Sequence, residues 1–195
     1  MPSFYSLLFA IALLGGCASQ PSDPTGIWIN QAAIDAAVET GRLRESLLAY
    51  GPNLEWQIDI AKQQATFSNG FELEDGQLSA EPKQRWQVSF YGETHEFLRL
   101  RNNVLTQEAG PTWPEQRFTR PTAKVLPDAP VGSSFEHSLY QAYLGGTWKI
   151  VKGTGEGGLV LFHADGRIEG LPASERFALC LAGDCAAMSG EHDSL

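Results

Sequence analysis

Residues that could form an active site are sparse in this chain, and their spacing favours structural roles. Positions 153–158 read Gly-Thr-Gly-Glu-Gly-Gly, which satisfies the GxGxxG pattern of nucleotide-binding loops. That pattern holds a pyrophosphate only where a strand leads into a helix, because the amides at the helix N-terminus bind the anion. Here the strand-like run 159–162 follows, and Glu156 would repel a phosphate. We therefore interpret 153–158 as a hairpin loop and expect no cofactor.

The residue types of a hydrolase triad and of a metal site also occur, without the required arrangement. Triad members normally come from separate elements, whereas four candidates here are adjacent and read as a solvated tail: Glu191, His192, Asp193 and Ser194. No HxxxH, HxH or HExxH pattern joins the four histidines, which are His95, His137, His163 and His192. We expect no metal, and the sequence assigns no catalytic residue.

The beginning of the chain contains the strongest chemical signal, a cysteine after an apolar run. Residues 4–14 (FYSLLFAIALL) are uncharged, and their length is typical of a secretory signal peptide and too short to span a bilayer. The following Leu14-Gly15-Gly16-Cys17 resembles the lipobox of bacterial lipoproteins. This resemblance implies cleavage before Cys17, acylation of its sulfur and amine, and attachment to a membrane face. Ala18 in place of Asp implies, in that family, the outer membrane.

The lipobox divides the N-terminal region into a signal peptide, residues 1–16, and an acylated tether, residues 17–24. The tether is polar and contains Pro21 and Pro24, a composition typical of a linker. Residues 1–3 supply no Lys or Arg, which departs from the positively charged start of most signal peptides. The alternative is a buried apolar strand with Cys17 in a core. We expect a lipid-anchored protein of the cell envelope, in the outer membrane and facing the periplasm.

Two further cysteines, Cys180 and Cys185, remain once Cys17 is assigned to the lipid. An oxidising envelope compartment favours a disulfide between them across the turn-like segment 182–184. A redox pair and half of a metal site are the alternatives.

Composition limits the classes of partner. The chain has 195 residues, 43% of them hydrophobic, and 23 acidic against 14 basic residues, which gives a formal charge of −9. Nucleic acids and anionic lipids are bound by basic surfaces, so neither is an expected partner without a local basic patch. The expected partners are the membrane through the N-terminal lipid, and an envelope protein or a small apolar ligand.

The segment 25–120 has the pattern of a β domain with a helical insertion. A short strand around Trp28 precedes the helical stretch 31–50, which Gly41 divides in two. Apolar residues alternate with Glu55, Gln57 and Asp59 over 54–60, which predicts a half-buried strand. Asn69-Gly70 and Asp75-Gly76 both predict hairpin turns, and Asn102-Asn103 another. Further strands are expected at 65–67, 71–73, 86–90, 95–100, 104–106 and 117–119.

A proline-containing linker, residues 121–134, separates this domain from a second segment, 135–195. Ser133 and Glu136 form a possible capping box for a helix that runs to Leu144. Strands are expected at 148–151, 159–162, 167–169 and 177–179, with a turn at Asp165-Gly166. These strands are too few for a closed barrel. We therefore expect either a chain truncated at its C-terminus or a sheet that takes its missing edge from elsewhere.

The Gly-x-Trp motif at the first strand, Gly26 and Trp28, resembles that of lipocalins and lipocalin-like envelope proteins. In those folds the tryptophan closes one end of the barrel and stacks on an arginine of the last strand. The resemblance implies this role for Arg117 or Arg120. Gly146 and Trp148 repeat the motif, in a segment that is similar to the opening of META-type envelope domains. The expected fold class is mainly β (α+β), a small antiparallel lipocalin-like barrel followed by an incomplete β segment.

The expected positions of the tryptophans help to choose between hypotheses about function. We expect Trp28, Trp56, Trp86 and Trp148 in cores, and Trp113, between two prolines, exposed in a loop. The preferred hypothesis is a non-catalytic binding or scaffolding lipoprotein. One alternative is a carrier of an apolar ligand, with a cavity of at least about 300 Å³ lined by Trp56, Phe67, Trp86 and Phe90. The other is an envelope enzyme, which requires polar residues with shifted pKa values converging in one cleft.

Overall fold

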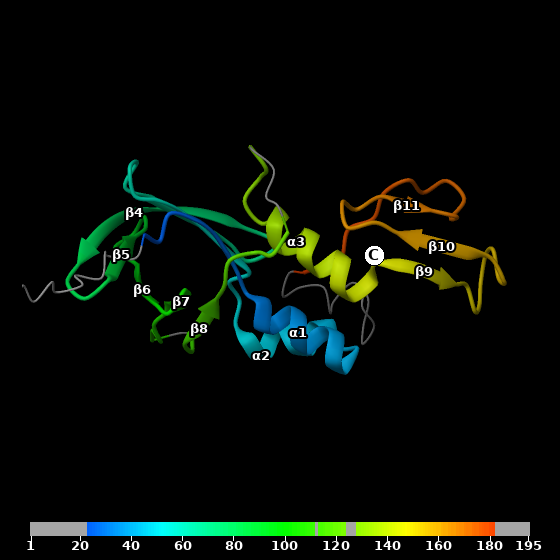
Figure 1. Cartoon of the computed structure of the whole chain (residues 1–195), viewed down its shortest axis with the longest axis horizontal. Coiled ribbons are helices and arrows are strands. Elements are labelled where there is room, and N and C mark those ends of the chain that lie inside the picture. The colour runs from blue at the N-terminus through cyan, green and yellow to red at the C-terminus, as the bar shows by residue number, and fades with distance from the viewer. Residues whose placement is uncertain (1–22, 112, 124–127, 182–195) are drawn as a thin grey trace, which may run out of the picture.

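The computed structural model describes residues 23–111, 113–123 and 128–181 of the chain (Figure 1). A large antiparallel sheet contains β1 (Gly26–Ile29), β2 (Glu55–Asp59), β3 (Gln64–Ser68), β4 (Leu73–Glu81), β5 (Arg85–Ser89), β6 (His95–Arg101), β7 (Val104–Gln107) and β8 (Gln116–Phe118). A small sheet contains β9 (Gly146–Lys149), β10 (Leu159–Phe162) and β11 (Ile168–Glu169). The helices are α1 (Gln31–Thr40), α2 (Leu43–Tyr50), α3 (Ser133–Leu139) and a π-helical turn, Tyr140–Leu144.

The large sheet is an up-and-down meander that nearly closes into a barrel. Its eight strands pair in chain order from β1 to β8. The two outer strands meet again, because Ile29 and Thr119 exchange both backbone hydrogen bonds, at 2.8 and 2.9 Å. This closure confirms the mainly β, barrel-like fold expected from the spacing of the strands.

Alternate turns of a meander lie at opposite ends, so the barrel has two distinct ends. The N-terminal end contains the start of β1 and the β2–β3, β4–β5 and β6–β7 turns. The helical end contains α1 and α2, which connect β1 to β2, together with the β3–β4, β5–β6 and β7–β8 connections. These two names are kept below.

The helical insertion forms as its sequence predicts. The side chain of Asn30 accepts a hydrogen bond from Ala33 N at 3.3 Å and caps α1. Gly41 ends that helix in a left-handed conformation, with φ of 68°, and its N–H donates to Ala37 O at 2.8 Å. The predicted break at Gly41 is confirmed.

A second hydrophobic core joins the helical end of the barrel to the C-terminal segment. In Figure 1, α3 lies above α1 and leads toward the small sheet. The core therefore contains residues from both sides of the segment 121–134: Ile29, Ile34, Ala37, Leu43, Leu54, Phe135, Leu139, Tyr140, Leu179 and Leu181. Because both sides bury their apolar residues in it, the barrel and the C-terminal segment support each other.

The small sheet has the order β11-β10-β9, so β9 is an edge strand. The glycine-rich segment 153–158 is the loop between β9 and β10, as expected, and Gly157 N donates to Ile150 O at 2.9 Å. The strand expected at 177–179 does not form. Phe177 instead packs on the rings of Tyr140 and Phe162, at centroid distances of 4.8 and 5.1 Å. Leu179 N donates to the Tyr140 hydroxyl at 3.3 Å rather than to a strand.

Asp75-Gly76 is not a turn, although Asn69-Gly70 is. The β3–β4 turn is made by Asn69, whose side chain accepts hydrogen bonds from Phe71 N and Glu72 N at 2.9 and 2.7 Å. Asp75 and Gly76 lie within β4, where Gly76 pairs with Ala65. A Cβ on Gly76 would lie 2.3 Å from Val88 Cγ1, so the glycine gives space to a neighbouring strand.

The expected capping box at the start of α3 is also wrong. Ser133 directs its hydroxyl to Pro130 O, and Gly132, with φ of 97°, precedes the helix. The first turn is capped from another element: Glu55 on β2 accepts a hydrogen bond from Phe135 N at 2.8 Å through Oε2. A carboxylate at a helix N-terminus satisfies free N–H groups, and here it comes from the barrel.

Some predictions concern residues outside the described ranges. These are the lipobox with Cys17, the residue Cys185 that is the expected disulfide partner of Cys180, and the four residues Glu191 to Ser194. The Cys180–Cys185 disulfide therefore stays a prediction. Within the described ranges, no helix is long and apolar enough to cross a membrane.

Candidate functional site

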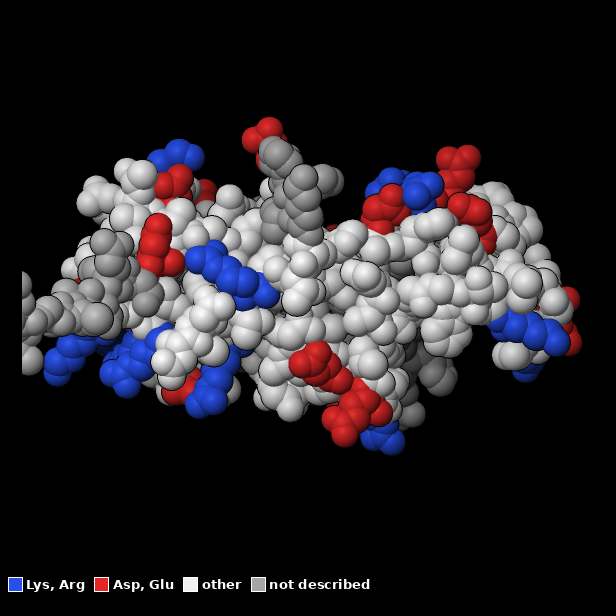
Figure 2. All heavy atoms as spheres, in the orientation of Figure 1, with Lys and Arg blue, Asp and Glu red and all other residues white. Residues whose placement is uncertain are grey.

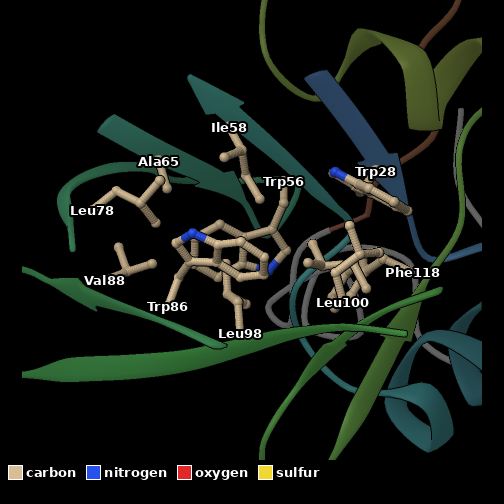
Figure 3. Packing of buried hydrophobic residues seen from close by; sticks show 11 residues of the cluster. Trp28, Trp56, Ile58, Ala65, Leu78, Trp86, Val88, Leu98, Leu100 and Phe118 are labelled. Atoms are coloured by element: carbon tan, nitrogen blue, oxygen red, sulfur yellow. The ribbon is translucent and has the colours of Figure 1, made fainter. Parts of the chain in front are cut away.

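The barrel interior is filled by aromatic and aliphatic side chains. Trp56 is fully buried, and its ring lies 5.3 Å from that of Phe67 and 6.4 Å from that of Phe90. Trp86 belongs to the same cluster. In Figure 3 the labelled side chains point inward from strands on facing walls. The four residues expected to line a ligand cavity are therefore brought together, but they contact one another.

Buried amide side chains close the helical end of the barrel. Gln107 Oε1 accepts hydrogen bonds from Trp56 Nε1 at 3.2 Å and from Asn53 Nδ2 at 2.8 Å. Gln116 Nε2 donates to the carbonyl oxygens of Tyr50 and Asn53 at 3.2 and 3.1 Å. These bonds tie the end of α2 to β7 and β8. Since they satisfy buried polar groups, we assign these amides a structural role.

The Gly-x-Trp motif closes the N-terminal end. The guanidinium carbon of Arg120 lies 3.8 Å from the ring centroid of Trp28, so Arg120 is the stacking residue, whereas Arg117 pairs with Glu115. Arg120 also donates to Ile27 O at 3.4 Å and Asp23 O at 3.3 Å. Burial lowers the pKa of Arg120. Gly26 has φ of 115°, a conformation that strains any side chain, and a Cβ there would also lie 2.5 Å from Arg120 Nη1.

The second copy of the motif has the same local geometry without the burial. Gly26 and Gly146 both have φ of 115°, and the indole N–H of each tryptophan donates to the carbonyl four residues before it, at 2.7 Å for Trp28 and 2.6 Å for Trp148. Trp148 is nevertheless 50% exposed, so its predicted place in a core is wrong. It lies on the edge strand β9, which no further strand of the described chain covers.

A cleft of about 560 Å³ lies beside α3 and combines carboxylates with a tyrosine. Burial raises the pKa of Glu136, and burial together with the Glu136 charge raises that of Tyr140 to about 12. The lining residues also include His137, Asp165 and Arg176. Among the described lining residues, the Ser133 hydroxyl donates to Pro130 O and the Tyr140 hydroxyl accepts from Leu179 N, so neither is paired with a histidine or carboxylate. The cleft therefore has polar groups for binding but no formed nucleophile–base pair.

Each of the three loops between paired strands at the helical end, β3–β4, β5–β6 and β7–β8, has one exposed aromatic side chain, and Tyr50 at the end of α2 is also exposed there. Phe71 in the β3–β4 turn is 75% exposed, Tyr91 in the β5–β6 turn 99%, and Trp113 in the β7–β8 loop 47%. We call these three residues the aromatic rim. The exposure of Trp113 confirms the sequence prediction. Phe71 and Tyr91 were missed, although each lies beside a turn glycine, Gly70 and Gly92.

The loops that carry the aromatic rim are acidic. Segments 69–72, 90–94 and 108–115 contain Glu72, Glu93, Glu108 and Glu115, and no Lys or Arg. Glu108 is neutralised by Arg85 and Arg99, whose hydrogen bonds and charges lower its pKa. Glu115 pairs with Arg117 at 3.0 Å, and Glu72 and Glu93 give the rim its negative charge. Exposed aromatic side chains with a charged margin are typical of protein contact surfaces.

Metal ligands do not gather in the described part of the chain, where no group of three His, Cys, Asp or Glu side chains could hold an ion. His163 instead contacts Glu169 at 2.8 Å. Comparisons of the chain with protein-family models, with curated proteins and with solved structures found no match.

Proposed function

We propose that this protein is a lipid-anchored envelope protein with a non-catalytic binding role, in which Cys17 carries the lipid and the aromatic rim contacts a protein partner. The observation that carries the proposal is the position of the rim. It lies at the helical end of the barrel, whereas the N-terminal tether joins the opposite end at the start of β1. An anchored barrel would thus present its exposed aromatic side chains away from its point of attachment.

The interior supports a surface-binding role over carriage of an apolar ligand. A carrier needs an internal cavity, but Trp56, Phe67 and Phe90 pack against one another where the ligand would lie. Tyr91 and Phe71, in contrast, have most of their surface free. Aromatic side chains lose little conformational entropy on binding and bury a large area, which favours them as contact residues.

The charge around the rim indicates the chemistry of the partner. Glu72 and Glu93 lie in the β3–β4 and β5–β6 connections of the rim, which contain no Lys or Arg. A partner surface with an apolar centre and basic margins would complement them, and the charges would speed the encounter at low ionic strength. We therefore place an envelope protein with a basic contact surface as the partner.

Site-specific photocrosslinking in cells that produce the protein tests this proposal. A photoreactive phenylalanine analogue at Phe71, Tyr91 or Trp113 should give a discrete crosslinked species. The same analogue at Ile60, which is 39% exposed in the β2–β3 turn of the N-terminal end, is the matched control and should give none. Adding Glu72→Lys and Glu93→Lys should remove the crosslinks. Equal crosslinking at Ile60 and Tyr91, or none at the rim, would refute the proposal.

A further inference from the structure

Basic side chains collect at the N-terminal end of the barrel, although the chain as a whole is acidic. Lys62 and Lys83 lie in the β2–β3 and β4–β5 turns, and Arg101 ends β6. Figure 2 shows Lys and Arg side chains along the lower left of the barrel, over β5 to β8. The β3–β4, β5–β6 and β7–β8 connections at the helical end contain glutamates and no Lys or Arg, whereas the helical insertion at that end also contains Arg42 and Arg44. The turns between strands therefore carry charge of opposite sign at the two ends of the barrel.

Two of the basic residues at this end, Lys83 and Arg101, have no ion-pair partner in the described part of the chain, whereas Lys62 and Arg85 do. Lys62 contacts Asp59 at 3.1 Å, and Arg85 pairs with Glu81 and Glu108. Lys83 and Arg101 are both exposed, and neither has a carboxylate partner among the residues that the structure describes. Unpaired cations close together repel each other, and a bound anion would relieve that repulsion.

Lys83 and Arg101 line the same groove. Its volume is about 320 Å³, and its lining residues are Lys83, Gln84, Leu100, Arg101 and Asn102. The groove is held by backbone contacts, since Leu100 N donates to Gln84 O at 3.1 Å. Lys83, Gln84 and Asn102 have positive φ values of 67°, 57° and 50°, as expected of tight turns. Two cations and two amide side chains therefore surround one recess on ordered turns.

We infer that this groove binds the phosphodiester headgroup of an anionic phospholipid of the membrane to which the protein is anchored. This inference rests on the proposed lipid anchor, because the anchor determines which surface the N-terminal end faces. Asp23 is the sixth residue after Cys17, which gives a reach of about 20 Å when the chain is fully extended. Arg120 holds Asp23 O at 3.3 Å at this same end. The tether therefore keeps the basic end near the headgroups and the acidic rim away from them.

The chemistry of the groove fits a phosphodiester with a polar headgroup. The Arg101 guanidinium and the Lys83 ammonium supply charge-assisted hydrogen bonds to phosphate oxygens. The amides of Gln84 and Asn102 can donate to or accept from headgroup hydroxyls. Attraction of basic residues to an anionic membrane extends over about one Debye length, roughly 8 Å at physiological salt, so it acts only on the end that the tether holds close.

The test follows backbone amide resonances during a lipid titration. The 195-residue chain with Cys17→Ser, which cannot carry the acyl chain, is titrated with dihexanoylphosphatidylglycerol below its micelle concentration. Dihexanoylphosphatidylcholine and inorganic phosphate are titrated separately. Phosphatidylglycerol should shift the amides of 83–84 and 100–103, with a Kd at least about tenfold lower than for either other compound. Lys83→Glu with Arg101→Glu should weaken it about tenfold or more, because each basic residue contributes roughly fivefold at an anionic surface.

A matched variant controls for net charge. Lys149→Glu with Lys152→Glu makes the same change in charge on exposed residues of the small sheet and should bind phosphatidylglycerol like the parent chain. Equal binding of inorganic phosphate would overturn the assignment to a lipid headgroup. Shifts outside the groove, or equal losses in both double variants, would overturn the site itself. Because the titrated chain has no anchor, a protein that proves unacylated in cells would remove only the proposed function.

Discussion

Glu55 has an environment that its local sequence pattern does not predict. Over 54–60 it occupies a polar position of an alternating strand, which normally faces solvent. In the structure it is fully buried and accepts the N–H of Phe135, which is 80 residues away in the chain. Burial raises its pKa, against the backbone N–H groups at the start of α3, which lower it. One carboxylate thus links the barrel to the C-terminal segment.

Replacing Glu55 should show how much this link contributes to stability. Glu55→Ala removes the acceptor and leaves the buried N–H of Phe135 unsatisfied, so it should lower the unfolding free energy by about 1–3 kcal/mol. Glu55→Gln keeps one carbonyl acceptor and should lose less. Gln57→Ala, on an exposed position of the same strand, is the control and should change stability by under about 0.5 kcal/mol. Urea unfolding measures all three, and equal losses for Ala at 55 and 57 would contradict the capping role.

The raised pKa of Glu55 predicts the sign of a pH effect. A carboxyl with a pKa above its ordinary value of 4.5 in the folded state contributes most stability below about pH 4.5, and that contribution is lost as the pH rises through the raised folded pKa. Glu55→Gln does not titrate. The unfolding free energy of this variant minus that of the parent should therefore increase from about pH 4.5 upward. Urea titrations at several pH values test this, and a difference that falls with pH would contradict it.

Residue roles that depend on near neighbours or on a familiar motif could be predicted, and roles that depend on distant partners could not. The motif resemblance placed Trp28 at a barrel end and limited its partner to two arginines, of which Arg120 is the one. Nothing in the sequence around Glu55 predicts that its side chain caps a helix far along the chain. Trp148 shows the same limit, because its indole N–H makes the same local hydrogen bond as that of Trp28 while its burial depends on strands elsewhere.

At the scale of elements, the alternation of apolar and polar residues and the turn glycines predict most of the barrel. They do not show which of two similar hairpin dipeptides forms a turn. Asn69-Gly70 and Asp75-Gly76 are both hairpin dipeptides. Only the first is a turn, because Asn69 bonds to the backbone of the next residues, whereas Gly76 makes room for Val88 and Phe90 on the neighbouring wall. Packing between strands decides which of the two dipeptides forms a turn, and this packing cannot be read from a single sequence.

Gly76→Ala tests this explanation. The added Cβ would lie 2.3 Å from Val88 Cγ1 and 2.8 Å from the Phe90 ring, so the variant should lose about 1–3 kcal/mol of unfolding free energy through overpacking. Gly110→Ala is the matched control, because its nearest contact would be Glu96 Oε2 at 4.0 Å and neither glycine has a positive φ. Thermal and urea unfolding should separate the two variants. Comparable stability of both would mean that Gly76 is not required by close packing.

At the scale of the whole molecule, the two hydrophobic cores are connected through β1. Trp28 belongs to the interior core and the adjacent Ile29 to the core under α3, and Ile29 also closes the barrel through Thr119. The sequence predicted a linker between two segments, since prolines interrupt the periodicity over 121–134. It could not show that residues from both sides bury one another, because apolar residues on a helix do not identify their partner.

Leu139→Ala should therefore destabilise the barrel as well as α3. Leu139 is fully buried in the core under α3, and its truncation should cost about 2–5 kcal/mol. Fluorescence of the buried tryptophans reports the barrel, and far-ultraviolet circular dichroism reports the whole chain. Both should shift together to lower urea. Leu48→Ala, at a residue 74% exposed on α2, should leave both unchanged. An unshifted fluorescence transition in Leu139→Ala would show that the two parts unfold independently.

The proposed orientation of the barrel depends on how the chain is attached, and the intact mass of the mature protein from the membrane fraction tests this most directly. The lipid-anchor proposal predicts a chain that begins at Cys17 and carries the added mass of a diacylglyceryl group and an N-acyl chain. It also predicts that Cys17→Ala yields neither cleavage nor acylation. A mature protein that retains residues 1–16 and has a free thiol at Cys17 would contradict the anchor and the orientation of the barrel derived from it.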